Sequence, residues 1–200
     1  MNAVDYRFGM VKGPGDPPKR RYRSRASSME ALRSAALEVL MTVGPEQVTI
    51  REIAERADVA HVYIPQYFGG KAELLADIYP AAAIEAAEVF SWPGTTSLGI
   101  RPELLRLARL TLWLSANHPD GVPSGPRPLA TRLTNAITQN FKLDDHTANL
   151  VTERLIALVL VFANAPTAIS PEPIDLAAHI ELEMRLLTAL AKARSTDPSD

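Results

Sequence analysis

Apolar residues recur at helical spacing over most of the chain, and no segment shows a convincing alternation of apolar and polar positions. Between residues 28 and 43, the apolar side chains would share one face of a helix. Further helical patterns cover 71–90, 102–117, 128–141 and 174–193, and another follows a cap at Asp144 or Asp145 and runs to about residue 164. With two short helices between the first two of these patterns, the segments named here number eight, and the sequence predicts an all-α fold of about nine helices.

Glycine and proline mark the breaks between these patterns. Residues 1–18 are rich in both, so we expect them to be disordered, and 91–101 and 118–126 are expected loops. Pro102 suits the first position of the helix that it opens. Pro80 lies in the middle of a long helical pattern, where we expect a kink.

The last two helical patterns are more apolar than a single chain of this length can bury. The segment 155–165 is apolar on nearly every face, so we expect it to be buried on nearly every face. In the last pattern the residues expected to point inward are Leu176, Ile180, Leu186, Leu187 and Leu190. Two copies that pack these helices together would form a four-helix bundle. We therefore expect a homodimer through residues 147–193.

Residues 49–75 predict two short helices joined by a tight turn and followed at once by a longer helix. Thr49 and Glu52 form the pattern of a capping box at the start of the first short helix. Asp58 occupies the turn, and Asp tolerates left-handed backbone geometry. Residues 61–68 would form the second helix, which a Gly-Gly pair ends. This is the pattern of a helix-turn-helix, whose second helix enters the DNA major groove.

The segment resembles the DNA-binding domain of the TetR family of bacterial transcription regulators, and residues 27–44 resemble the first helix of that domain. The residues that match the family pattern in register are Thr49, Ile50, Ile53, Ala54, Ala57, Val59, Ile64, Tyr67, Phe68, Lys71 and Leu74. The resemblance implies a helix-turn-helix DNA-binding domain at 28–75. It also implies a helical domain at 76–194 that dimerises and binds a small apolar effector.

Three residues depart from the family pattern. Asp58 replaces the usual Gly, and Ala60 replaces the usual Ser or Thr cap, which loses about 1 kcal/mol of capping. Pro65 replaces the family's usual Tyr. A proline inside a helix removes a hydrogen bond and costs about 3 kcal/mol. We therefore expect the second helix to begin late, near 62–64, or to be distorted.

The resemblance also implies which residues face DNA, namely Arg51, His61, Val62, Tyr63, Tyr67 and Lys71. Lys71 would meet a phosphate at the start of the long helix, and Arg51 would reach a base edge or a phosphate. The phosphate contact of the tyrosine that Pro65 replaces cannot be made here unless Tyr63 or Tyr67 takes it over. The alternative is that some of these side chains are exposed without any contact.

Charge is unevenly distributed, although the formal net charge of the chain is −2. Residues 1–27 hold seven Lys and Arg against two Asp, and the remainder is acidic. The basic run KRRYRSR at 19–25 immediately precedes the helix-turn-helix. We expect residues 1–27 to form a basic, disordered arm that follows phosphates or enters the minor groove. The alternative is a solvated tail.

Candidates for lining an effector cavity are the aromatic residues and one histidine of the second domain. They are Phe90, Trp92, Trp113, His118 and Phe141, with plain core packing as the alternative for each.

The sequence shows no pattern typical of an enzyme. The four histidines are scattered without metal-ligand spacing, and no nucleophile or phosphate-loop motif occurs, so no catalytic residue, metal or cofactor is expected. The absence of cysteine, of a signal-peptide core and of a run of 18 apolar residues favours a cytoplasmic protein without a membrane partner.

Together these patterns predict a TetR-like DNA-binding regulator, expected to be a repressor. It would bind a pseudo-palindromic operator as a homodimer, and a small molecule would modulate that binding. The alternative function, which Pro65 motivates, is a ligand-binding or interaction protein of the same fold that has lost specific DNA binding.

Overall fold

The structure, a computed structural model, describes residues 24–90, 101–125, 127–164 and 175–196. These residues form eight α-helices and one 3-10 turn, and no strand occurs among them. The elements are α1 (Arg25–Val39), α2 (Ile50–Arg56), α3 (Tyr63–Phe68), α4 (Lys71–Val89), α5 (Pro102–Asn117), η1 (Pro119–Gly121), α6 (Pro128–Phe141), α7 (Asp145–Asn164) and α9 (Leu176–Thr196). The predicted all-α fold is confirmed.

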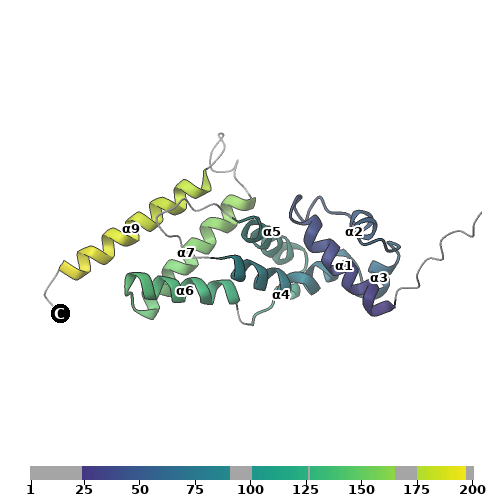
Figure 1. Cartoon of the computed structure of the whole chain (residues 1–200), viewed down its shortest axis with the longest axis horizontal. Coiled ribbons are helices and arrows are strands. Elements are labelled where there is room, and N and C mark those ends of the chain that lie inside the picture. The colour runs from purple at the N-terminus through teal and green to yellow at the C-terminus, as the bar shows by residue number, and fades with distance from the viewer. Residues whose placement is uncertain (1–23, 91–100, 126, 165–174, 197–200) are drawn as a thin grey trace, which may run out of the picture.

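The helices form an elongated molecule with the helix-turn-helix at one end (Figure 1). Helices α1, α2 and α3 surround the beginning of α4, whereas α6, α7 and α9 lie toward the opposite end, with α4 and α5 between them. One core cluster runs from Leu32 of α1 through Ile78 of α4 to Leu114 of α5. Because α4 and this core continue past residue 75, the DNA-binding helices and the helices that follow are packed as one unit in this region.

Helix α1 begins and ends earlier than the predicted range of 28–43. Ser24 caps it, since the Ser24 hydroxyl accepts a hydrogen bond from the backbone N–H of Ser27 at 3.1 Å. After Val39 the chain turns through bonds between residues three apart, such as Thr42 N–H to the Val39 carbonyl at 3.0 Å. The apolar pattern begins later than the helix, because the capping residue Ser24 lies before the first turn that has a buried side chain. Residues 25–27 are therefore helical, which corrects the predicted arm boundary at 27.

The helix-turn-helix has the local geometry that the sequence predicts. The Thr49 hydroxyl accepts a hydrogen bond from the Glu52 N–H at 3.2 Å and so caps α2. Asp58 has a left-handed φ of 51°, and the following Val59 N–H donates to the Ala54 carbonyl at 3.0 Å. The chain thus reverses direction between α2 and α3 with its backbone groups bonded.

The second half of the chain follows the predicted helices closely, because prolines and an aspartate mark their starts. Helices α5 and α6 have the predicted bounds, each with a proline at its beginning. Asp144 caps α7, accepting the Thr147 N–H at 2.9 Å. Helix α4 is continuous through Pro80, where the kink remains a prediction.

Burial in the last two helices differs from the expectation. Within 155–164, Leu155 is buried, but Ala157 and Val161 are exposed, so this segment is not enclosed within one chain. In α9, Leu187 is buried, whereas Leu186 is exposed. An apolar stripe on a helix is buried only where a neighbouring helix covers it. The described helices of one chain do not cover the whole apolar surface of α7 and α9.

By length and composition alone, α7 is long and apolar enough to cross a membrane, and core helices of soluble proteins can be equally long and apolar.

Candidate nucleic-acid interface

Helix α3, the second helix of the motif, begins at Tyr63, which confirms the expected late start. Tyr63 N–H and Ile64 N–H donate to the carbonyls of Ala60 and His61 at 3.0 and 3.1 Å. The His61 carbonyl, which an N–H at position 65 would normally bond, therefore already has a donor. Pro65 is the third residue of the helix, where backbone N–H groups lack intrahelical partners in any case. The helix thus accommodates the proline in its first turn.

Helix α3 has little stability of its own. It is six residues long, has no side-chain cap at Val62, and among its residues only Ile64 is buried. It ends at Gly69, whose φ of 102° is left-handed and whose N–H donates to the Pro65 carbonyl at 3.1 Å. Since short helices are marginal in isolation, neighbouring side chains must hold α3 in place.

The start of α3 presents a group of exposed side chains. His61, Val62 and Tyr63, all predicted to face DNA, are exposed there. Gln66 is exposed one turn after Tyr63 and was missed by the sequence analysis, although its helical spacing from Tyr63 could have identified it. A Gln side chain can pair with the major-groove edge of adenine. This end of α3 therefore carries the side chains suited to base contacts.

A stack of side chains lies along one side of α3. The rings of Tyr63 and Tyr67 are nearly parallel, with centroids 5.0 Å apart and an interplanar angle of 9°. Arg25 is the first residue of α1. Its guanidinium lies over the Tyr67 ring, with the Cζ atom 5.1 Å from the ring centroid. The stack connects the start of α1 to the exposed start of α3.

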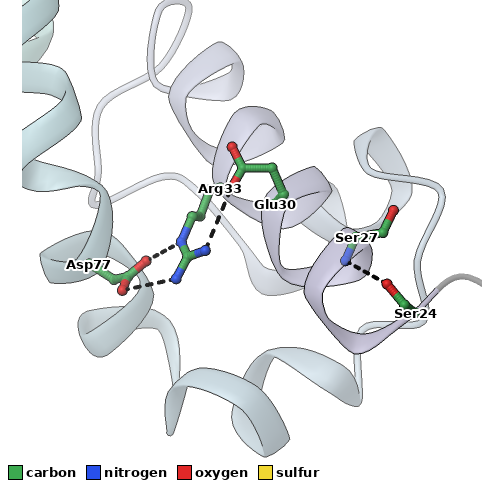
Figure 2. A network of polar contacts seen from close by, with 5 residues as sticks. All are labelled: Ser24, Ser27, Glu30, Arg33 and Asp77. Atoms are coloured by element: carbon green, nitrogen blue, oxygen red, sulfur yellow. Dashed lines mark hydrogen bonds and ion pairs between the residues drawn. The ribbon is translucent and has the colours of Figure 1, made fainter.

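Arg33 makes a second connection from α1 to the helices that follow it. Its guanidinium lies 5.6 Å from the Phe68 ring centroid and donates twice to the Asp77 carboxylate, at 2.6 and 3.3 Å. Figure 2 shows this fork-shaped pair reaching from α1 to α4, with Glu30 at 3.5 Å on the same guanidinium. The hydrogen bond to Asp77 raises the pKa of Arg33. The end of α3 and the first turns of α4 are thereby fastened to α1.

Lys71 differs from the exposed residues of the predicted interface. It is the first residue of α4, it is half-buried, and its Nζ lies 5.1 Å from the ring centroid of Trp113 on α5. Burial lowers the pKa of the Lys71 ammonium from its ordinary value. Its side chain would have to leave Trp113 to reach a phosphate. Arg51, by contrast, is exposed on α2.

The predicted effector residues do not gather in one place. Phe90 and Phe141 pack against the cluster formed by α6 and α7, whereas Trp113 packs against the core of α1 to α5. His118 lies at η1, where its carbonyl accepts the Gly121 N–H at 2.8 Å. Trp92 lies outside the described residues. Spacing along the sequence could not separate the two clusters, since both consist of apolar helix positions.

Comparisons with known proteins agree with the geometry of α1 to α4. Residues 32–78 match the family of bacterial regulatory proteins, tetR family. No curated protein matches the sequence.

Similar solved structures include a tetR-family transcriptional regulator from Streptomyces coelicolor, with 20% identity, coverage of 84% of this chain and 83% of that chain, and a TM-score of 0.47. A possible TetR family transcriptional regulator from Streptomyces coelicolor A3(2) has 21% identity, coverage of 85% and 99%, and a TM-score of 0.46. TetR from Acinetobacter baumannii AYE has 21% identity, coverage of 80% and 89%, and a TM-score of 0.39.

Proposed function

We propose that this chain, whose residues 32–78 match the tetR family of bacterial regulatory proteins, represses transcription by binding a pseudo-palindromic operator as a homodimer. A small molecule bound by the C-terminal helices would modulate that binding. The proposed function has no catalytic step, and its site of action is the cytoplasm, where bacterial DNA lies.

The exposed start of α3 is the observation that carries the proposal. A helix that reads the major groove contacts base edges through its N-terminal residues. Here those residues are His61, Val62 and Tyr63, with Gln66 on the following turn, and all are exposed. Pro65 motivated the alternative of lost DNA binding, but it lies in the first turn without interrupting a bond that the helix needs. The geometry therefore favours DNA binding.

The homodimer is supported by the uncovered apolar surface of α7 and α9. Leu150 and Val161 on α7 and Leu182 and Leu186 on α9 are large apolar residues that are exposed in one chain. A second copy packing its own α7 and α9 against these would complete a four-helix bundle. A two-fold dimer would also place two copies of α3 about one DNA turn apart, as a pseudo-palindromic operator requires.

The effector proposal is supported by the course of α4. This helix begins at Lys71, directly after α3, and ends beside the α6–α7 cluster against which Phe90 and Phe141 pack. A ligand that favours one arrangement of α6 and α7 would displace α4, and α4 would carry α3 with it. The two arrangements must differ in ligand affinity for such coupling to occur, typically by about 1–3 kcal/mol.

The test is a binding titration of the full chain with two fluorescent duplexes, one of random sequence and one selected from a random pool by the protein itself. We expect the selected duplex to contain an inverted repeat and to bind at a stoichiometry of two chains. Affinity for both duplexes should fall as salt rises. Binding that is absent at low salt, or equal on both duplexes, would contradict an operator-binding function.

A further inference from the structure

Helix α3 depends on side chains from other helices for its orientation. It has no side-chain cap, and Ile64 is its one buried residue. Two arginines of α1, about two turns apart, each lie over an aromatic ring of α3: Arg25 over Tyr67 and Arg33 over Phe68. These two otherwise similar arginines differ in what their N–H groups contact.

Arg33 is satisfied within the chain. The Asp77 carboxylate accepts hydrogen bonds from two N–H groups of Arg33, and Glu30 lies close to a third. Arg33 therefore fastens α1 to α4. Arg25 is exposed, and among the described residues no carboxylate lies within ion-pair distance of it. A guanidinium that stacks through its face keeps its donors at the edge of the plane, where a phosphate can bind two of them. The N–H groups that Arg33 uses for Asp77 are therefore available in Arg25 for a phosphate.

Arg25 contacts the second turn of α3 and not its first residue. Tyr63 is the first residue of α3, Tyr67 lies one turn further along, and the Arg25 guanidinium lies over the Tyr67 ring. The N-terminal residues of α3 are those that enter the major groove, and the first helix of the motif, α2, crosses the sugar-phosphate backbone. Arg25 belongs to neither helix, and a guanidinium held over Tyr67, one turn further along α3, would meet the backbone at the edge of the groove.

We propose that Arg25 binds a DNA phosphate beside the groove that Tyr63 enters, and that the stacked rings of Tyr67 and Tyr63 position its guanidinium for this contact. The proposal rests on the proposed DNA-binding function. It separates Arg25 from the basic run that precedes it, because Arg25 belongs to α1 and is oriented by an aromatic ring. A phosphate contact would add affinity on every sequence and carry no base preference.

The experiment measures binding of the full chain to a random-sequence duplex of about 30 base pairs, which accommodates two recognition helices, over a series of KCl concentrations. Arg25→Gln should reduce the slope of log affinity against log salt by about 0.9 for each chain bound, since one phosphate contact is lost. Arg56→Gln is the matched control, because Arg56 is also exposed in the same domain but pairs with Glu38 at 3.2 Å. It should leave the slope unchanged.

The positioning role of Tyr67 is tested by a double-mutant cycle with Arg25. Tyr67→Leu should reduce the slope as Arg25→Gln does, because the ring that positions the guanidinium is lost. Combining Tyr67→Leu with Arg25→Gln should cause no further loss, since both remove the same contact. Circular dichroism and thermal unfolding of each variant verify that the fold is intact.

The outcomes separate this inference from the proposed function. If the wild-type chain binds with a salt-dependent affinity but Arg25→Gln has the slope of Arg56→Gln, the phosphate contact is refuted and the DNA-binding function stands. Additive losses from Tyr67→Leu and Arg25→Gln would refute the positioning role. A wild-type chain that shows no salt-dependent binding would overturn the proposed function and this inference together.

Discussion

Arg106 is a buried charge in a position where a helical core usually places an apolar residue. From α5 its Nη1 donates to the Leu37 carbonyl and contacts the Met41 sulfur, each at 3.2 Å, while its Nη2 pairs with Glu85 of α4. The last carbonyls of α1 lack intrahelical donors and carry partial negative charge, so a guanidinium is well placed there. Arg106 therefore joins the DNA-binding helices to α4 and α5.

Arg106→Met should lower the free energy of unfolding by about 2 kcal/mol, because hydrogen bonds to a buried charged group are lost and the Leu37 carbonyl is left without its donor. Glu85→Gln should cost less, since Glu85 is 44% exposed on its side chain and an amide oxygen still accepts a hydrogen bond. Urea unfolding followed by circular dichroism measures both variants. Equal losses would mean that the ion pair, and not the contacts to α1, stabilises this junction.

Pro65 and Gln66 are adjacent, yet a proline has opposite consequences at the two positions. Pro65→Ala should change the free energy of unfolding by less than about 1 kcal/mol, because the first turn leaves the N–H of residue 65 without a helical partner. Gln66→Pro should cost about 3 kcal/mol, because it removes the bond from Gln66 N–H to the Val62 carbonyl, at 3.4 Å. Thermal unfolding of the two variants makes the comparison. Similar losses would show that the start of α3 is misplaced.

At the scale of elements, α4 links the DNA-binding helices to the rest of the chain. It begins directly after the left-handed Gly69 and the following glycine, and its first side chain, Lys71, lies against Trp113 of α5. The expected phosphate contact of Lys71 would compete with its contact to Trp113, because both use the same ammonium. DNA binding is therefore expected to change the environment of Trp113.

A Trp92→Phe variant would leave Trp113 as the single tryptophan of the chain. We expect addition of duplex DNA to change its emission, and Lys71→Met to remove that change and weaken binding of all sequences to a similar degree. A fluorescence titration against duplex concentration measures both effects. Unchanged emission at saturating DNA would show that Lys71 stays on Trp113 and binds no phosphate.

At the scale of the whole molecule, α7 and α9 present the surface that a second chain would cover. Leu182 and Leu186 are 54% and 47% exposed, although both lie in a long helix with an apolar face. Within one chain α9 is fastened to α7 by the Arg154–Glu183 ion pair at 2.7 Å and by the Phe162 and His179 rings, whose centroids are 4.9 Å apart.

Leu182→Glu and Leu186→Glu should each convert a dimer to a monomer of unchanged helicity, because a dimer would bury the new charge without a partner whereas the free chain keeps it in water. Leu112→Glu is the matched control, since Leu112 is exposed on α5 and belongs to neither helix of the proposed interface. Light scattering with circular dichroism gives mass and fold together. Dimers that persist in both α9 variants would place the interface elsewhere.

The sequence by itself determined the local features of this protein. Caps, prolines and a left-handed turn position act within a few residues, so Thr49, Asp58 and Pro102 predicted helix boundaries that the structure confirms. Of the two candidate caps Asp144 and Asp145, it is Asp144 that caps α7. The long fixed spacing of the helix-turn-helix made the family recognisable, and that match is confirmed at 32–78. The late start of α3 also followed from Pro65 alone, because proline acts on its own turn.

Only the tertiary structure decided which side chains meet across helices. The way in which α1, α4 and α5 cross decides that Lys71 lies against Trp113 and that Arg25 lies over Tyr67. It also decides that Arg106 contacts the last turn of α1. The tertiary structure also placed Phe90 and Phe141 at one cluster and Trp113 at another, and it left α7 partly uncovered. Helical periodicity shows that a residue faces a neighbour, but it does not show which neighbour, because contacts between distant segments depend on the packing of whole helices.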